Sequence, residues 1–286
     1  MRFNVALARR VALILGLSFP AFSNALAEGR AVLPPRWMVE AYLSDAVVKP
    51  SRDDIARAII PGLGMVPAFL GGATDGPTPT FVAVSANGNG TTAAMPAGWA
   101  VGDLLMIFAS AYLDTFTDPA GHNIPSGWAE IGSYLLNFNS QYRSRIRAFY
   151  RIAQSGDSTV SLTVSDGSTR MNSIMMAYRG VNTSSPFEGV DALGTQSASS
   201  SIPYAQITTL GVNRVVLQVI TAWNTVGVAS TPASGWTERF DYGSGIGIAI
   251  DERTFASAGL TSAGNQTRTV SVPWWRLAFA IKPAQI

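Results

Sequence analysis

Pro125-Ser126-Gly127-Trp128 recurs 108 residues later in the chain as Pro232-Ala233-Ser234-Gly235-Trp236. In each place, proline fixes φ for a turn and glycine adopts a conformation that other residues avoid. The tryptophan then begins the next strand. Two interpretations of this tryptophan stay open: a buried plug at the end of a β-sandwich, or an exposed platform for a sugar ring. A third relative, Pro96-Ala97-Gly98-Trp99, lies upstream of the first copy.

The segments around the two turns repeat at nearly the same spacing. The apolar runs that precede them begin at Asp103 and Arg214, 111 residues apart, and the closing strands begin at Met171 and Trp274, 103 residues apart. Solenoid repeats are shorter, at ~20–50 residues. The pattern therefore predicts a mainly β fold, a jelly-roll-like antiparallel β-sandwich built from a duplicated unit, with copies at about 80–189 and 190–286. The alternative is two separate sandwiches of ~100 residues each.

Local composition distinguishes strands from loops in this part of the chain. The run from Asp103 to Ala111 is nearly all apolar, which is typical of a strand buried on both faces. The serine-rich stretch Ser197 to Ser201 reads as a surface loop.

The first 79 residues differ in character from the rest. Residues 30–60 show helical spacing of apolar side chains, and residues 1–60 are expected to be a helical docking segment, followed by a Gly/Pro-rich linker at 61–79. Residues 1–27 also fit a secretory signal peptide, with Arg9-Arg10, an apolar run and Ala25-Leu26-Ala27, and this alternative stays open. The apolar run Val11 to Phe22 is shorter than the ~20 residues of a membrane span, so no span is expected.

Composition excludes several classes of function. The chain of 286 residues has a net charge of +2 and no cysteine, so disulfides, thiolate metal sites and cysteine nucleophiles are absent. No run of Lys or Arg indicates nucleic-acid binding. No nucleophile elbow, phosphate loop or zinc-protease motif is present. We therefore expect no enzyme, no catalytic residue, no metal site and no cofactor.

The candidate binding residues lie on two predicted strands. Arg143, Arg145 and Arg147 alternate with smaller side chains, so one face of that strand is basic and either binds an anionic partner or pairs with nearby carboxylates. Trp274 and Trp275 are neighbours in a strand, so one is expected in the core and the other on the surface.

Three further groups have side chains that could form a site. His122, the only histidine, is expected to be a solvated loop residue, and Asp114 with Asp118 could join a calcium site but read as solvated loop acids. Asp251 and Glu252 are adjacent in a strand, so their side chains should face opposite ways and cannot flank one glycosidic bond.

Several turns and core segments together resemble a family of proteins. They are Gly102-Asp103-Leu104-Leu105, Pro125 to Trp128, Ala148 to Ala153, Ser155-Gly156-Asp157, Ala177 to Val181 and Pro186-Phe187. This set resembles β-sandwich proteins among the structural genes of tailed bacteriophages, over about residues 80–190 and weakly over copy two, where Ile281-Lys282-Pro283 stands in place of Tyr-Arg-Gly. The resemblance implies a virion component, a tail, fibre or head-spike protein that is often trimeric.

The expected function follows from this resemblance. Residues 1–60 would attach to other virion proteins, and the sandwich would contact a host glycan or a neighbouring subunit without chemistry, as a homo-oligomer. The alternative is a secreted or periplasmic carbohydrate-binding or adhesin module behind a signal peptide.

Overall fold

The computed structural model describes residues 75–85, 90–113, 122–137, 143–163, 170–223, 229–243 and 246–286. The chain divides into two compact units, and all described residues except Ile286 belong to the unit Asp75–Gln285. The expected docking segment at 1–60, its signal-peptide alternative at 1–27 and residues 61–74 of the expected linker lie outside the described residues.

The described residues form antiparallel sheets, which confirms the prediction of a mainly β fold. The first sheet has the order β1-β7-β3-β5-β4. Its strands are β1 (Thr80–Val84), β3 (Leu104–Leu113), β4 (Ala129–Asn137), β5 (Arg143–Ile152) and β7 (Arg170–Arg179). A separate two-stranded sheet pairs β2 (Thr92–Ala93) with β6 (Val160–Ser161).

The second sheet comes from the second half of the chain. Its order is β11-β15-β10-β13-β12, and β8 also pairs with β15. The strands are β8 (Phe187–Pro203), β10 (Arg214–Trp223), β11 (Ser230–Thr231), β12 (Thr237–Tyr242), β13 (Ile246–Phe255) and β15 (Asn265–Ile281). Another two-stranded sheet pairs β9 (Thr208–Thr209) with β14 (Gly259–Leu260).

The strands of the two halves correspond in order, except that β11 has no counterpart in the first large sheet. The order β1-β7-β3-β5-β4 in the first half corresponds to β8-β15-β10-β13-β12 in the second, and each half adds one two-stranded sheet. Both β4 and β12 carry a register shift that begins two residues after the repeated tryptophan, at Glu130 and at Glu238. β8 begins at Phe187, slightly before the expected start of copy two at 190.

The jelly-roll type of the predicted sandwich is not confirmed. Each large sheet takes its strands from one continuous half of the chain, whereas the Greek keys of a jelly roll divide successive strands between two sheets.

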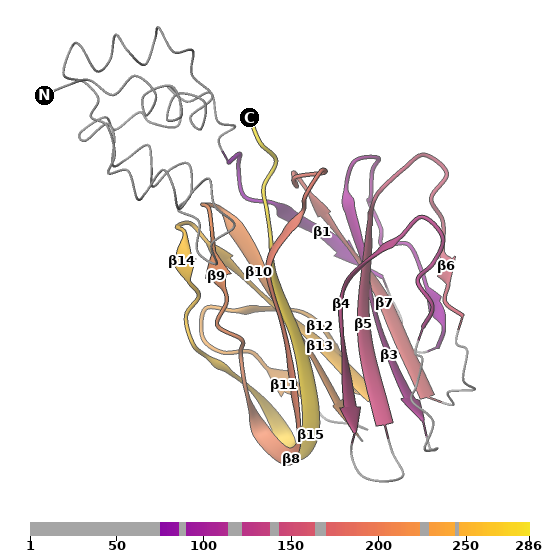
Figure 1. Cartoon of the computed structure of the whole chain (residues 1–286), viewed down its shortest axis with the longest axis vertical. Coiled ribbons are helices and arrows are strands. Elements are labelled where there is room, and N and C mark those ends of the chain that lie inside the picture. The colour runs from indigo at the N-terminus through magenta and orange to yellow at the C-terminus, as the bar shows by residue number, and fades with distance from the viewer. Residues whose placement is uncertain are drawn as a thin grey trace, which may run out of the picture. The chain divides into compact units, whose positions relative to one another are not determined.

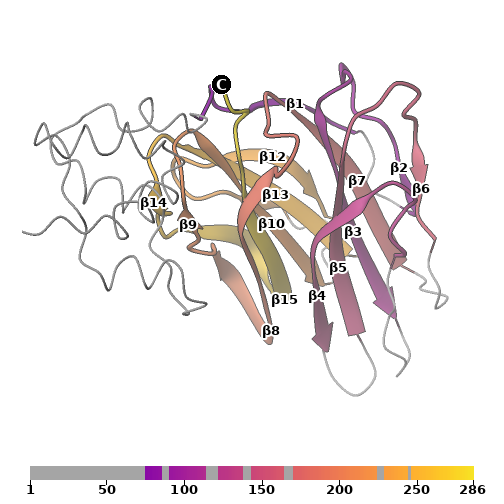
Figure 2. The same cartoon turned by 45° about the horizontal axis from the view of Figure 1, so that its top comes forward.

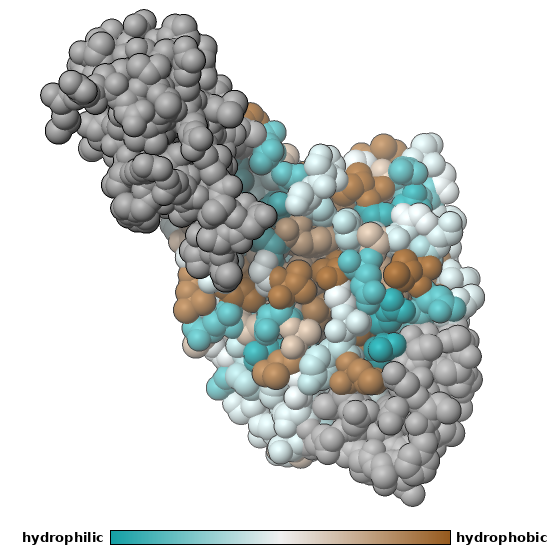
Figure 3. Space-filling model, viewed as in Figure 1, coloured by the Kyte–Doolittle hydropathy of each residue, from teal (hydrophilic) through white to brown (hydrophobic). Residues whose placement is uncertain are grey.

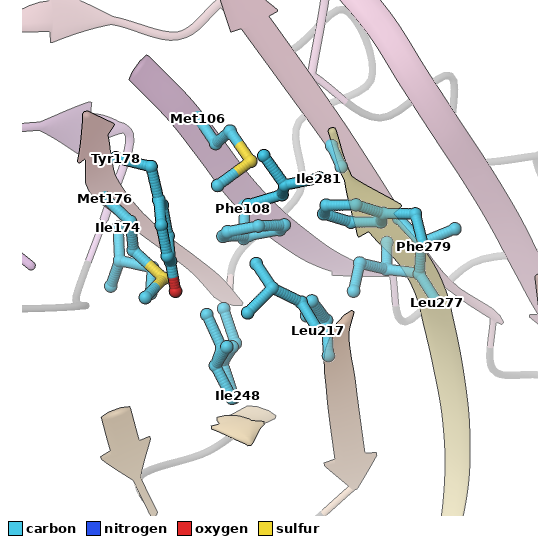
Figure 4. Packing of buried hydrophobic residues seen from close by; sticks show 14 of the residues in the cluster. Met106, Phe108, Ile174, Met176, Tyr178, Leu217, Ile248, Leu277, Phe279 and Ile281 are labelled. Atoms are coloured by element: carbon cyan, nitrogen blue, oxygen red, sulfur yellow. The ribbon is translucent and has the colours of Figure 1, made fainter. Parts of the chain in front are cut away.

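The elements lie in four layers, which Figures 1 and 2 show from two sides. The two large sheets are in the middle, with β2 and β6 beyond the first sheet and β9 and β14 beyond the second. Buried side chains from both large sheets meet in one core, where the rings of Phe108 and Phe279 lie 6.2 Å apart (Figure 4). Residues 75–285 therefore share one core between the halves, rather than forming two independent sandwiches.

Both faces of the central strands are buried, as the apolar run predicted. Leu104, Met106 and Phe108 of β3 face the shared core. Leu105 and Ile107 face the opposite way, into a second cluster on the outer side of the first sheet. A third cluster covers the outer side of the second sheet. Three apolar clusters stabilise the unit, because burial of apolar surface contributes ~25 cal/mol per Å².

The repeated turn has the same geometry in both halves. The amide of Trp128 donates to the carbonyl of Pro125 at 3.1 Å, and the amide of Trp236 donates to that of Ala233 at 3.0 Å. Gly127 and Gly235, the third residues of these turns, have φ of 77° and 80°, as a type II turn requires. Both tryptophans are buried in the outer clusters. They are plugs, and the exposed-platform interpretation is wrong.

Two segments differ from expectation. The stretch Ser197 to Ser201 is not a loop but part of β8, because pairing with β15 outweighs the low strand preference of serine. Residues 75–79 of the expected linker belong to the β unit. Asp75 accepts the amide of Val212 at 3.1 Å and lies 2.8 Å from Arg214 Nη1.

Candidate functional site

The basic stripe on β5 is partly an internal ion pair. Arg147 donates to the carboxylate of Glu130 from Nε at 3.0 Å and from Nη2 at 2.8 Å, and its side chain is 14 % exposed. Hydrogen bonding to Arg147 lowers the pKa of Glu130. The sequence left two alternatives for the stripe, binding of an anionic partner or pairing with nearby carboxylates. Arg147 pairs with a carboxylate. Arg145 is half-buried on the same face, and the side chain of Arg143 lies outside the described residues.

The expectation that one of the paired tryptophans faces outward is wrong. Trp274 is 5 % exposed and Trp275 is fully buried. The two rings do point to opposite faces of the second sheet, since Trp275 packs in the shared core and Trp274 in the outer cluster. The physical reason is that a further layer covers the outer face of the second sheet, so neither face of β15 meets solvent at these two residues.

The structure differs from the sequence-based expectation at His122 and agrees with it at Asp251 and Glu252. His122 is 1 % exposed, not solvated, and its carbonyl accepts Arg147 Nη1 at 2.5 Å. Asp114 and Asp118 lie outside the described residues. Asp251 and Glu252 do face opposite sides, as predicted, because Asp251 bonds Tyr204 in the outer layer and Glu252 bonds Tyr178 between the sheets.

A pocket of about 310 Å³ opens beside the first repeated turn, on the outer side of the first sheet. Its apolar lining comes from Met95, Leu105, Trp128 and Val160. This volume is at the lower end of small-ligand sites, which span ~300–1,000 Å³. The pocket therefore has room for one small ring-sized ligand.

An ion pair lies in the polar part of this pocket. Arg151 Nη1 lies 3.1 Å from Asp157 Oδ1, and Arg151 Nη2 donates to Gln154 Oε1 at 2.9 Å. The amide of Gln154 donates to Asp157 Oδ2 at 2.8 Å, which holds the carboxylate in place. Arg151 Nε is buried without a hydrogen-bond partner. One donor of the guanidinium thus stays unsatisfied.

The pocket gathers residues from three separated segments. Ser126 and Trp128 come from the repeated turn, Arg151 from the end of β5, and Asp157 from the turn before β6. The guanidinium of Arg151 lies 5.9 Å from the centre of the Trp128 ring. Sequence reasoning missed Arg151, although it continues the alternation of Arg143, Arg145 and Arg147 along β5.

The same position in the second half is filled by aromatic rings. Trp236 packs against Tyr204 at 4.5 Å and against Phe255 at 6.2 Å between ring centres. Arg253, the counterpart of Arg151, donates to Ser262 Oγ at 2.8 Å. The two halves thus place tryptophan and arginine alike, but the rings that cover Trp236 have no aromatic counterpart in the lining of the Trp128 pocket.

A buried polar cluster lies on the outer side of the second sheet. Tyr204 Oη donates to Asp251 Oδ2 at 2.5 Å, and Gln266 Nε2 donates to the same oxygen at 2.8 Å. Burial raises the pKa of Asp251 to about 6. Gln218, which is paired with Asp251 in the ladder, exchanges two hydrogen bonds with the backbone of Ala205. These hydrogen bonds therefore hold the segment at Tyr204 and Ala205 against the outer face of the second sheet.

Within the described ranges, no group of three or more histidine and acidic side chains is placed to hold a metal ion. The same residues contain no helix with the length and apolar character to cross a membrane. No protein-family model, curated protein or solved structure matches the chain.

Proposed function

We propose that the protein is a structural component of a tailed-phage virion, of the tail, fibre or head-spike type, and that residues 75–285 form a module for contact with a host surface or neighbouring subunits. The observation that carries the proposal is the separation of this β unit from residues 1–74. A module that buries its own core leaves the preceding segment available for attachment to other virion proteins. The resemblance of residues 80–190 to phage β-sandwich proteins supplies the class of particle.

The surface chemistry supports a binding role without catalysis. Several arginines of the unit are paired with carboxylates within it, as Arg179 is with Asp103 and Arg214 is with Glu188. Apolar and polar residues are interspersed on the face shown in Figure 3. A surface with few unpaired charges suits contacts between subunits, because charged residues are depleted at the centres of interfaces. A homo-oligomer, with a trimer favoured, belongs to this proposal.

We also infer that the β unit arose by duplication. The matching strand orders, the matching register shifts in β4 and β12, and the two turns of the same geometry support this inference. In this arrangement, each copy supplies one large sheet, and the two copies pack their inner faces together.

Truncation tests whether the segment before residue 75 serves attachment while the β unit folds without it. A chain of residues 75–286 should stay soluble and folded by circular dichroism, yet should not enter particles that incorporate the full chain. Antibodies against residues 75–286 should label intact particles in electron microscopy. Failure to find the full chain in any purified particle, or a truncated chain that assembles as well as the full one, would overturn the proposal.

The pocket beside Trp128 favours a second candidate, a secreted carbohydrate-binding or adhesin module. N-terminal sequencing of the native protein separates the two. A start at Met1 or Arg2 supports the docking segment, and a start at Glu28 supports cleavage of a signal peptide and secretion.

A further inference from the structure

We infer that the pocket lined by Trp128, Arg151 and Asp157 binds one neutral saccharide ring. This inference rests on the proposed function, since both invoke binding without chemistry, and it names the ligand class. It differs from the exposed-platform interpretation of the sequence, because Trp128 is buried and contributes to the wall of a recess rather than to a flat surface.

The apolar part of the pocket fits the carbon-bound hydrogens of a sugar ring. Met95, Trp128 and Val160 line it from the segment that follows β2, from the repeated turn and from β6. Sugars present C–H groups on one face and hydroxyls around the edge. A pocket of about 310 Å³ accommodates a single ring more readily than a chain of several.

The polar part of the pocket fits the hydroxyls at the edge of the ring. Guanidinium groups only donate hydrogen bonds and ionised carboxylates only accept them, while a sugar hydroxyl can do both. Arg151 and Asp157 lie in contact at 3.1 Å, so neighbouring hydroxyls of one ring can accept from the first and donate to the second.

The charge of the pocket favours a neutral ligand over an acidic one. Asp157 neutralises Arg151, and the remaining polar lining residues, Ser126, Ser158 and Thr159, are uncharged. A carboxylated sugar would have to approach Asp157 as well as Arg151, at a Coulomb cost of about 1 kcal/mol even in water at ~4 Å. Neutral hexoses and N-acetylhexosamines meet no such repulsion.

In the second half of the chain, aromatic side chains occupy the position that corresponds to the pocket. There Tyr204 and Phe255 pack against Trp236, and Tyr204 Oη accepts the amide of Ala233 within the repeated turn. Arg253 is engaged with Ser262 rather than with a carboxylate. Arg253 is therefore a matched control for Arg151 in the same molecule.

The test uses the full-length chain on an array of immobilised neutral and acidic glycans, followed by calorimetry with the methyl glycoside of the best-bound terminal sugar. Binding of a neutral sugar is expected. Arg151→Gln and Ser158→Trp should each weaken it at least 10-fold, the first by removing donors and the second by filling the pocket. Arg253→Gln should change the affinity less than 2-fold. Thermal unfolding of each variant verifies that the fold is intact.

Three results would overturn the inference: binding of no glycan, binding of acidic glycans alone, or neutral binding that both pocket variants leave unchanged. If Arg151→Gln fails to fold, Ser158→Trp decides the question, because Ser158 is exposed and its replacement fills the pocket from the rim. Particle labelling is independent of these results. A negative array with labelled particles removes the saccharide site and leaves the virion proposal intact.

Discussion

Tyr178 on β7 donates a hydrogen bond to Glu252 on β13 across the interface of the two large sheets, with 2.5 Å between Oη and Oε2. The pKa of Tyr178 lies well above its ordinary value, mainly because the side chain is buried and also because the negative charge of Glu252 is near. The hydroxyl therefore keeps its proton and donates. Arg239 donates to both oxygens of the same carboxylate and lies 4.5 Å from the centre of the Phe81 ring. This polar contact links strands from both halves within an apolar interface.

Tyr178→Phe is expected to lower the free energy of unfolding by about 1–3 kcal/mol, because it leaves a buried carboxylate oxygen with one donor fewer. Urea denaturation at neutral pH measures the change. Tyr150→Phe is the control, since the Tyr150 hydroxyl makes no hydrogen bond within the described residues. Equal stability of Tyr178→Phe and the wild type would show that the contact does not hold the sheets together.

Asp251 should make the stability depend on pH. Its pKa rises from 3.8 to about 6 in the folded protein through burial. Between these values the unfolded chain has lost the proton while the folded chain retains it, so the free energy of unfolding falls as the pH rises. The loss is about 3 kcal/mol, from about 1.4 kcal/mol per pKa unit, and above pH about 6 it stays constant.

Asp251→Asn should therefore remove this slope. Urea denaturation of both proteins at pH 4, 5, 6 and 7 gives the difference in stability. Because the two proteins share every other carboxylate, that difference isolates Asp251. A difference that stays flat from pH 4 to 7 would contradict the raised pKa.

The repeated turns should resist substitution of their glycines. Gly127→Ala and Gly235→Ala should each cost about 1–2 kcal/mol, because φ near 80° crowds the Cβ of an L-residue. Thermal unfolding measures the loss. Ser126→Ala changes the neighbouring exposed position and should be nearly neutral. If Gly127→Ala were as mild as Ser126→Ala, the turn would have to adopt another form.

Gly194 on β8 gives a test of close packing against Trp275. A Cβ at this position would lie 2.7 Å from Trp275 Cβ and 2.7 Å from Tyr134 Cε1. Gly194→Ala should thus destabilise the protein by about 1–3 kcal/mol through overpacking. Leu193→Ala, at an exposed neighbouring residue, should have a smaller effect. Chemical denaturation of both variants distinguishes crowding from a general sensitivity of β8.

One half of the β unit should not fold alone. A chain of residues 75–185 would expose Leu104, Met106 and Phe108, which the second sheet buries in the complete unit. We expect aggregation, or a spectrum without dispersed amide resonances. A cooperative unfolding transition in the isolated half would instead support two autonomous domains.

The sequence predicts the architecture well where local pattern and burial agree. The apolar run from Leu104 to Ala111 indicates a strand covered on both faces, and the repeated Gly-Trp turn marks corresponding corners. The alternation rule also places Trp274 and Trp275 on opposite faces. It does not predict that both faces are covered, because the covering layer comes from segments distant in the chain.

The pocket could not be predicted from local pattern. Trp128, Arg151 and Asp157 belong to different elements, and only the pairing of β4 with β5 and the turn that follows β5 bring them together. The alternating arginines of β5 are visible in the sequence, but the sequence does not show that Glu130 on the neighbouring strand neutralises Arg147. Charge pairing across strands depends on register, which a single strand does not encode.

The shared core also has a consequence for synthesis. Strand β15 completes the second sheet and ends at Ile281, so the inner face of the first sheet is not fully covered until synthesis has reached Ile281. At ~5–20 residues per second, the ribosome needs roughly 5–20 s to add the ~100 residues that follow the first sheet. During that interval an apolar sheet is accessible to other nascent chains. We therefore expect efficient production of this protein to need a chaperone that covers the exposed sheet, or a low expression level that keeps nascent chains apart.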